Sequence, residues 1–506
     1  MGIRSFFAKP FARKVVKKHQ KSHAQAIQIQ ENWLKNNLKK AEQTIFGQAY
    51  EFDKIRNYLE YKIRVPIAEY EDLKTYIDEM VLGSPNILWP GKPAYFAKTS
   101  GTTSGAKYIP ISKESMPFHI SGARDALLHY VHYSGNSAFL DQKLIFLSGS
   151  PELESKHGIP TGRLSGIVNH HVPGYLRSNQ LPSYETNCIE DWEEKLEAIV
   201  HETIQQRMGL ISGIPPWVQM YFDRLETLSG QKIGDLFPDF QLFVTGGVNF
   251  EPYRQKLMDS IGRDIDVVET YPASEGFIAF QDSSGEEGLL LNVDGGIFFE
   301  FVPTETYFTA TPKRLMLSEV QIGVNYALLM STNAGLWSYS IGDTVKFVSL
   351  NPFRIVVTGR IKHFISAFGE HVIAEEAERA MAEALKACPE ASLVEFTLAP
   401  QVSPSAGELP YHEWLVEFAQ MPQDPAKFQA VLEASMYAQN IYYKDLITGK
   451  VLQPLKLTIL QANAFIDYMK SEGKLGGQNK VPRLANDRVI ADKLKSLVAS
   501  RQSRER

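Results

Sequence analysis

The stretch FAKTSGTTSGAKYIPIS, residues 96–112, is the most informative one in the chain. Seven of the nine residues from Thr99 to Lys107 are Thr, Ser or Gly, and the run closes on a lysine. Glycines let backbone N–H groups turn toward an anion, Ser and Thr add hydroxyl donors, and Lys107 adds a full positive charge. A nucleotide triphosphate suits such a loop, although this composition is also common in plain turns. It is not a Walker A sequence, because Ala-Lys-Tyr follows Gly105 in place of Gly-Lys-Ser/Thr.

The composition bounds the class of protein. With 506 residues, 44% apolar and 22% charged, the chain is too long for one core, and we expect a globular protein of about two or three domains. A net charge of -5 is mild and argues against nucleic acid as the main ligand. The two cysteines, Cys188 and Cys388, lie far apart and form no CxxC pair, which indicates a reducing compartment. We therefore expect a cytoplasmic protein.

The beginning of the chain is basic. No acidic residue precedes Glu31, and the segment lacks the apolar core of a secretion signal. A basic amphipathic helix can touch anionic lipid, and a solvated basic face is the plainer interpretation. No stretch approaches the roughly 20 apolar residues of a membrane span, so we expect no stable membrane insertion. The basic residues are Arg4, Lys9, Arg13, Lys14, Lys17, Lys18 and Lys21.

Hydrophobic periodicity separates a helical beginning from a sheet-forming middle. Trp33, Leu34 and Leu38 recur at helical spacing, and residues 1–80 are predicted to be helical. After the Gly/Pro-rich residues 83–96, short apolar runs end in turn residues, which is typical of buried strands in an α/β sheet. These runs are 143–149, 240–247 and 264–271.

More strands are expected before residue 360. Residues 288–303 predict a β-hairpin that turns at Asp294-Gly295. Residues 336–348 and 353–360 predict further strands.

The pattern changes after Arg360. Residues 373–388 predict an amphipathic helix, since Ala377, Ala380 and Ala384 belong to one apolar stripe. Two strands, a helix near 426–438 and another strand follow, which make a compact α+β unit. We place a domain boundary near residue 360.

Two motifs in the middle of the chain carry candidate binding residues. In ETYPASEGF, residues 269–277, Tyr271 can stack on a purine and Glu275 can hold a magnesium ion. In WSYSIGDTVKF, residues 337–347, Asp343 can accept hydrogen bonds from both ribose hydroxyls. Surface turns and hairpins use the same residue types, so each motif alone is weak.

Two later motifs add cations. In GRIKHFISAFGEHV, residues 359–372, Arg360 can reach ribose or phosphate, and this stretch on the boundary can act as a hinge. In GGQNKVPRL, residues 476–484, Lys480 stands in a Gly-rich loop before a proline. A polar linker and a solvated lysine are the plainer interpretations.

Other kinds of active site are not supported. The TSGTTSG run lacks the strand-to-helix context and the ordered triad of a serine hydrolase. The adjacent pair His170-His171 is expected on a strand, where neighbouring side chains point apart, and no spaced third ligand completes a metal site.

Taken in order, the motifs resemble those of the adenylate-forming superfamily of acyl and aryl ligases, luciferases and peptide-synthetase adenylation domains. TSGTTSGAK resembles its phosphate loop, and YPASE is similar to its Y-G-x-T-E. SYSIGD is similar to Y-R-T-G-D, and residues 359–372 are similar to G-R-x-D/K-x-I-x-x-x-G-E-x-I. The set in this order is specific, although each member alone is not.

A closer resemblance is to the auxin-responsive promoter family of acyl acid amido synthetases, which join acids such as indole-acetate or jasmonate to amino acids. That family shares the YxxSE spelling, a turn like Gly246-Gly247 and a late K-x-P-R like that of residues 480–483. The resemblance runs from about residue 90 to residue 485. Two positions depart from it: Ser340 stands where an arginine is usual, and Pro272 replaces a small residue.

The resemblance implies an α/β fold: a large N-terminal adenylate-forming domain, residues 1–360, with mixed sheets flanked by helices, and a small mobile α+β C-terminal domain, residues 361–506. It implies ATP and Mg²⁺ as cofactors, with Glu275 on the metal. Lys107 and Lys480 would be catalytic, and Lys362 would be the hinge. The implied ATP-binding residues are Thr99, Ser100, Gly101, Thr102, Thr103, Gly246, Gly247, Tyr271, Ser274, Asp343 and Arg360.

The implied reaction is adenylation of a small carboxylic acid followed by transfer of the acyl group to an amine, an amino acid being favoured. An acyl ligase of the same superfamily that forms a coenzyme A thioester remains an alternative. A third hypothesis is a non-catalytic nucleotide-binding scaffold. The five charged positions Lys107, Glu275, Asp343, Arg360 and Lys480 are all present, which favours an enzyme.

Overall fold

The computed structural model describes residues 2–100, 106–172, 174–247, 250–361, 370, 372–402, 404, 408–475, 480–485 and 487–502. This part of the chain forms two compact units. The large unit comprises Met1–Gly213, Leu236–Gly247 and Ile265–Val357, and the small unit comprises Ile214–Asp235, Val248–Asp264 and Thr358–Arg506. The division of the chain at residue 360 stays a prediction.

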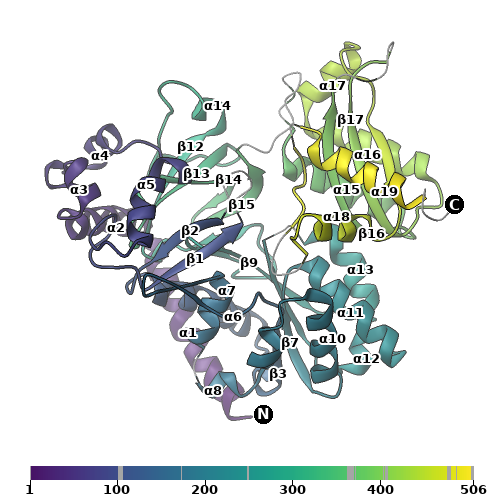
Figure 1. The fold of residues 1–506 in the computed structure, drawn as a ribbon, viewed down its shortest axis with the longest axis horizontal. Helices are drawn as coiled ribbons and strands as arrows, with labels where there is room; N and C mark the ends of the chain where they lie inside the picture. The colour runs from purple at the N-terminus through teal and green to yellow at the C-terminus, as the bar shows by residue number, and fades with distance from the viewer. Residues whose placement is uncertain are drawn as a thin grey trace. The chain divides into compact units, whose positions relative to one another are not determined.

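Helices occupy the first 81 residues, as the periodicity predicts (Figure 1). In α2, Leu34, Leu38 and Ala41 are buried on one face, and the side chain of Asn57 caps α4 by accepting from the N–H of Glu60 at 3.0 Å. The elements are α1 (Ile3–Ala24), α2 (Ala26–Ala41), α3 (Ile45–Ala49), η1 (Phe52–Lys54), α4 (Tyr58–Arg64) and α5 (Tyr70–Val81).

The Ser/Thr/Gly stretch begins and ends in an antiparallel strand pair. Strand β1 (Tyr95–Ser100) pairs with β2 (Ala106–Ile111), and Thr99 lies opposite Lys107. Residues 101–105 lie outside the described residues. The sheet continues with β5 (Ile159–Gly162) and β4 (Glu154–Lys156), in the order β2-β1-β5-β4.

A second sheet of 11 strands has the order β12-β13-β14-β15-β11-β10-β9-β8-β7-β3-β6. Neighbours from β6 to β9 are parallel, and β9, β10 and β11 are antiparallel. The strands predicted at 143–149, 240–247, 264–271, 336–348 and 353–360 are confirmed as β3, β8, β9, β14 and β15. The bounds are β3 (Lys143–Phe146), β6 (Gln180–Leu181), β7 (Met208–Ser212), β8 (Leu242–Gly246), β9 (Asp266–Ala273), β10 (Gly276–Phe280), β11 (Leu289–Leu291), β12 (Ile297–Pro303), β13 (Asn325–Thr332), β14 (Tyr339–Leu350) and β15 (Phe353–Arg360).

The hairpin predicted at 288–303 is wrong. Strand β11 pairs with β10 and β15, whereas β12 pairs with β13. The reason is Gln30 of α2, whose Nε2 donates to the carbonyls of Val293 and Ile297 at 2.8 and 2.9 Å. Its Oε1 accepts from the N–H of Phe299 at 2.8 Å. One buried amide thus satisfies backbone groups that a hairpin would pair.

The expected strand at His170-His171 is also wrong, because helix α7 (Leu164–His170) ends there. Nε2 of His170 lies 2.8 Å from the carbonyl oxygen of Pro151, and Nε2 of His171 lies 3.0 Å from Tyr95 Oη. Both rings therefore have structural partners. The remaining elements of the large unit are α6 (Met116–Ser134), η2 (Ala138–Asp141), α8 (Gly174–Arg177), α9 (Tyr184–Asn187), α10 (Trp192–Thr203), α14 (Thr304–Tyr307) and η3 (Leu317–Glu319).

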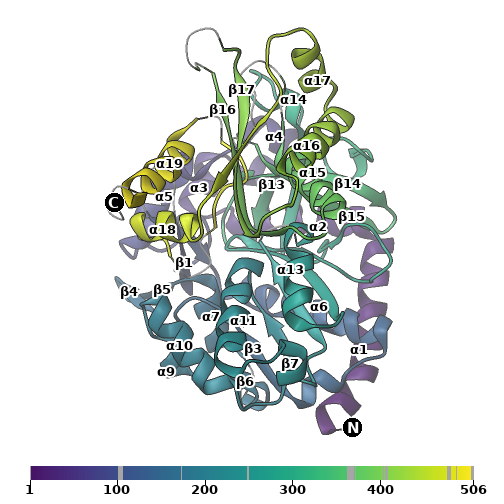
Figure 2. The same cartoon turned by 90° about the vertical axis from the view of Figure 1, so that its right-hand side faces the viewer.

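The small unit is built on a three-stranded sheet (Figure 2). Strands β16 and β17 are antiparallel, and β17 and β18 are parallel. The helix predicted at 373–388 is confirmed as α15, which buries Ala377, Ala380 and Ala384 and packs beside α16. The elements are α11 (Pro215–Ser229), α12 (Ile233–Leu236), α13 (Glu251–Ile261), α15 (Ala374–Ala387), β16 (Ser392–Gln401), β17 (Tyr411–Gln420), α16 (Pro425–Gln439), α17 (Ile441–Thr448), β18 (Lys456–Leu460), α18 (Ala464–Ser471) and α19 (Val489–Gln502).

These results confirm the predicted α/β fold class, with a large mixed-sheet unit and a small sheet-containing unit. Within the described ranges, no helix combines the length and the apolar character needed to cross a membrane.

Candidate functional site

Two parallel strands bring the first candidate residues together. Strand β8 ends at Gly246 and β9 ends at Ala273, and their register sets Gly246 opposite Thr270. Gly247 directly follows Gly246 in the chain, and Tyr271 directly follows Thr270. Ligands of open α/β sheets bind beyond the carboxyl ends of the parallel strands. The Gly-Gly turn and the YPASE motif therefore meet at the edge where a ligand is expected.

The backbone at this turn requires glycine. A Cβ added to Gly246 would lie 2.5 Å from the carbonyl oxygen of Thr270 and 2.8 Å from its Oγ1. That hydroxyl donates to the carbonyl of Thr245 at 3.0 Å, which holds it in place. Gly247 has φ +83°, in the left-handed region that favours glycine. The result is a stretch of backbone without side chains, which a flat ligand can approach closely.

Tyr271 and Asp343 lie 72 positions apart in sequence and are hydrogen-bonded. The hydroxyl of Tyr271 donates to Asp343 Oδ2 at 2.6 Å. The tyrosine is buried, with 8% of its surface exposed, and Asp343 is half-buried. The YPASE and SIGD motifs are thus in direct contact.

A bulge in β14 aims Asp343. Ala327 of β13 pairs with Thr344 and Leu329 pairs with Ser340, so that three residues, 341–343, lie opposite one. Gly342 within the bulge has φ +84°. Bulges of this kind redirect a side chain next to a site.

Ser274 and Glu275 form the turn between β9 and β10, and Ala273 pairs with Gly276 across it. Both turn residues are half-buried. Magnesium is often held by one or two carboxylates together with substrate phosphates. No group of three or more His, Cys, Asp or Glu suited to a metal occurs among the described residues.

Lys107 is half-buried on β2, directly across from Thr99. Its Nζ lies 5.3 Å from the ring centroid of Tyr70, a cation–π distance. The Tyr70 hydroxyl accepts from the N–H of Tyr108 at 3.0 Å, which ties α5 to β2. Ser100 ends β1, whereas Gly101, Thr102 and Thr103 lie outside the described residues.

The other candidate cations belong to the small unit. Arg360 is exposed at the end of β15, after Gly359 with φ +145°. Lys480 is exposed, and Lys362 lies outside the described residues.

A cluster of buried charged and polar side chains holds the segment after Lys480 in place. The sequence reasoning missed this cluster. The buried guanidinium of Arg483 pairs with Glu378 at 3.2 Å and with Glu395, and it donates to the hydroxyl of Tyr253. The two carboxylates raise the pKa of Arg483 and so hold its charge, although burial opposes this. The only signal in the sequence was the arginine of K-x-P-R, to which no role was given.

The backbone of the same segment is bound to β16. The Leu398 N–H donates to the carbonyl of Arg483 at 2.8 Å, and Thr397 Oγ1 donates to the carbonyl of Pro482 at 2.7 Å. Side-chain and backbone contacts together therefore fix the chain three residues beyond Lys480.

The glutamate of the GEHV motif, Glu370, is buried against His412, with Oε1 2.9 Å from Nε2. Its carbonyl accepts from Asn440 Nδ2 at 2.9 Å. The motif glutamate thus anchors the start of the C-terminal segment.

Ser340, which stands where an arginine is usual in the resembling family, is buried and accepts from the hydroxyl of Tyr307 at 2.8 Å. Nearby in sequence, Ser338 meets the buried Arg314, whose Nη2 lies 2.5 Å from its Oγ and 2.6 Å from Glu300. An arginine from another segment thus reaches the entry to β14.

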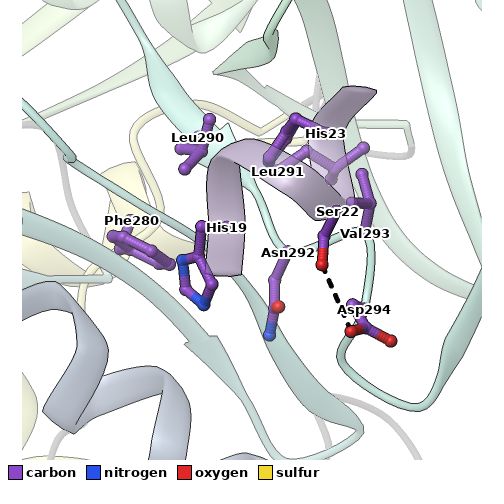
Figure 3. A pocket seen from close by; sticks show the side chains of 9 residues that line it. All are labelled: His19, Ser22, His23, Phe280, Leu290, Leu291, Asn292, Val293 and Asp294. Carbon is purple, nitrogen blue, oxygen red and sulfur yellow. Dashed lines mark hydrogen bonds between the residues drawn. The ribbon is translucent and has the colours of Figure 1, made fainter. Parts of the chain in front are cut away.

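A small pocket beneath α1 is separate from these residues (Figure 3). Ser22 donates to Asp294 at 3.4 Å at its edge. None of the candidate ATP residues lines it. The lining residues are His19, Ser22, His23, Phe280, Leu290, Leu291, Asn292, Val293 and Asp294.

Known proteins resemble the chain over most of its length. A jasmonoyl-L-amino acid synthetase of Nicotiana attenuata is 24% identical over 392 residues, which cover 63% of this chain and 66% of that protein. The chain thus spans slightly less than two thirds of that relative. An indole-3-acetic acid-amido synthetase of Arabidopsis thaliana is 20% identical over 549 residues, and the match covers 93% of this chain and 91% of that protein.

A solved structure described as the AtGH3.15 acyl acid amido synthetase in complex with 2,4-DB shares the fold. Its TM-score is 0.78 at 16% identity, with 96% of both chains covered.

Three family models match consecutive parts of the chain. They describe the N-terminal domain of the GH3 family at residues 15–186, its central domain at 290–360 and its C-terminal domain at 375–489. The chain belongs to the GH3 family.

Proposed function

We propose that this chain is an ATP-dependent acyl acid amido synthetase. It would adenylate a small carboxylic acid and transfer the acyl group to an amine of the amino acid class, releasing AMP and pyrophosphate. The observation that carries the proposal is the hydrogen bond between Tyr271 and Asp343 beside the Gly246-Gly247 turn. Family membership and the amido synthetase names of the relatives support it.

ATP would bind at the carboxyl ends of β8 and β9. The backbone of Gly246-Gly247 and the ring of Tyr271 would hold adenine, and Ser274 would lie beside them. Asp343 would accept from the ribose hydroxyls, with Arg360 near the ribose or phosphate.

The hydroxyl-rich stretch would hold the β- and γ-phosphates. Backbone N–H groups, hydroxyls and the Lys107 ammonium are all donors, which suits an anion. The residues concerned are Thr99, Ser100, Gly101, Thr102, Thr103 and Lys107.

Glu275 would hold a magnesium ion. The ion would supply positive charge where negative charge accumulates on the departing pyrophosphate. A half-buried carboxylate in a turn suits this role, because magnesium is usually bound through only one or two protein carboxylates.

In the first half-reaction, an oxygen of the acid attacks the α-phosphorus of ATP, and the bond to pyrophosphate breaks. Lys480 would stabilise charge on the α-phosphate and the carboxylate as a mobile point charge. The Arg483 cluster would position the loop that carries Lys480 by fixing its next residues to β16.

In the second half-reaction, the neutral amine attacks the acyl carbon, the bond to AMP breaks, and the amine loses a proton to a base that we do not assign. Residues 361–506 would move as the C-terminal domain between the two steps, with Lys362 as the hinge.

The test is acid-dependent exchange of labelled pyrophosphate into ATP across aryl and fatty acids, with wild type and Glu275→Ala. We expect exchange with at least one acid in wild type, a loss in Glu275→Ala, and no loss in a control, Glu287→Ala, at an exposed carboxylate. No exchange with any acid by folded, ATP-bound protein would favour the scaffold hypothesis.

Once the acid is known, amino acids and coenzyme A are offered in turn as acceptors. Formation of an amide supports the proposal. A thioester with no amide would establish the acyl-CoA ligase alternative instead. The proposed cytoplasmic location rests on the cysteine usage of the sequence alone.

A further inference from the structure

Helix α1 uses only part of its surface to pack within the large unit. Its buried face carries small side chains and contacts α6 and η2. The opposite side is exposed to solvent along most of its 22 residues. The buried positions are Ser5, Ala8, Ala12, Val15, Val16 and Ser22.

The exposed side begins with three aromatic rings. Phe6 is 65% exposed, Phe7 is 62% exposed and Phe11 is 43% exposed. The rings of Phe6 and Phe7 contact each other edge to face at 5.4 Å. Large exposed apolar groups gathered in one place mark an interaction surface.

Cations continue the same exposed side. Positions 7, 11, 14, 18 and 21 follow at alternating spacings of four and three, so they form one stripe along the helix. A second stripe beside it holds positions 6, 13 and 17. The exposed cations of the two stripes are Arg13, Lys14, Lys17, Lys18 and Lys21.

We propose that this aromatic and cationic face of α1 binds the surface of an anionic lipid bilayer. The phenylalanines would enter the boundary between headgroups and acyl chains, and the five cations would lie over anionic headgroups. A helix with aromatic rings and lysines on its free side, lying in the membrane plane, has the chemistry of an interfacial anchor. The described residues contain no helix that could span, so the contact is peripheral.

Charge argues against a second copy of this chain as the occupant. A two-fold contact would set the same five cations against each other, because no acidic residue precedes Glu31. Double-stranded nucleic acid would neutralise the cations but offers no unstacked bases to Phe6 and Phe7, and the net charge of -5 disfavours nucleic acid as a ligand. A bilayer accommodates both kinds of side chain.

The inference does not rest on the proposed enzyme activity. The match to the family's N-terminal domain begins at residue 15, so the three phenylalanines lie outside it. Of the five cations, Arg13 and Lys14 also precede the match, whereas Lys17, Lys18 and Lys21 lie within it.

The experiment is co-sedimentation of the full chain with vesicles of phosphatidylcholine alone or mixed with phosphatidylserine, at low and high salt. We expect binding only to the anionic vesicles, weakened by salt. Each cation is worth about five-fold in partitioning, so Lys14→Gln/Lys18→Gln should bind about 25-fold more weakly. Phe6→Ser/Phe7→Ser should lose about ten-fold or more.

A matched control, Lys35→Gln/Lys39→Gln, removes two exposed cations from α2 and should bind as wild type. Equal binding to neutral vesicles, equal loss in the control, or no vesicle binding would overturn the proposal. Self-association or nucleic acid binding without vesicle binding would also overturn it and would name another occupant. All the variants are at exposed positions and should melt at the wild-type temperature, which keeps loss of binding separate from loss of folding.

Discussion

Acid should destabilise the large unit through histidines buried in their neutral form. Nε2 of His129, on α6, lies 3.1 Å from Nδ1 of His19, on α1, and His19 Nε2 lies 3.2 Å from Asp125. Burial, with the nearby His19 as a second cause, lowers the pKa of His129 to about 3. Burial alone lowers the pKa of His119 to about 4.

Proton linkage determines whether the stability of the fold rises or falls with pH. An unfolded histidine has a pKa of about 6.5, so between about pH 6.5 and the folded value the unfolded state binds more protons. Stability is therefore fully present above pH 6.5 and falls as the pH drops below it. A pH of about 5 lies about 1.5 units below the pKa of an unfolded histidine. Protonation therefore stabilises the unfolded chain by about 2 kcal/mol per histidine at this pH. His119 and His129 together thus cost about 4 kcal/mol, a large part of a typical folding free energy.

The assay is urea unfolding at about pH 7 and about pH 5, followed by circular dichroism. Wild type should lose stability on acidification, and His129→Gln should lose about 2 kcal/mol less. A control, His201→Gln, changes an exposed histidine on α10 and should retain the wild-type difference.

An unchanged difference between the two pH values in His129→Gln would refute the reasoning. Equal stability of the wild-type protein at the two pH values would also refute it. A lower stability of His129→Gln at neutral pH alone would not bear on the claim, because only the difference between pH values isolates the proton.

Three further outcomes are expected. Arg483→Met should remove the guanidinium that pairs with the buried carboxylates of Glu378 and Glu395, destabilise the small unit by about 3–5 kcal/mol in urea unfolding, and reduce pyrophosphate exchange. Gly246→Ala should cost about 1–3 kcal/mol and weaken ATP binding in calorimetry, because its Cβ would meet a carbonyl at 2.5 Å; Gly285→Ala, in open space, should do neither. Tyr271→Phe should lose about 1 kcal/mol by removing the hydrogen bond to Asp343, and the KM for ATP in pyrophosphate exchange should rise about five-fold; an unchanged KM would separate this pair from ATP binding.

The sequence alone determined the elements whose signal is local. The alanines of α15 repeat at helical spacing, and the apolar runs of β3, β8 and β9 end at turn residues. These patterns depend on a few neighbouring residues. The apolar residues repeat with the period of the helix or strand and therefore lie on the face that becomes buried. The order of the short motifs could also be determined from the sequence alone, because it does not depend on contacts between distant residues.

Tertiary structure decided what depends on residues far apart in the chain. Gln30 separates β11 from β12 from more than 260 positions away, so the local Asp-Gly signal could not reveal it. The hydrogen bond from Tyr271 to Asp343 spans 72 positions, and Arg483 lies 230 positions from its partner Tyr253. Such contacts exist only once the sheet is assembled, because satisfying buried polar groups and charges is a property of the packed unit and not of any segment.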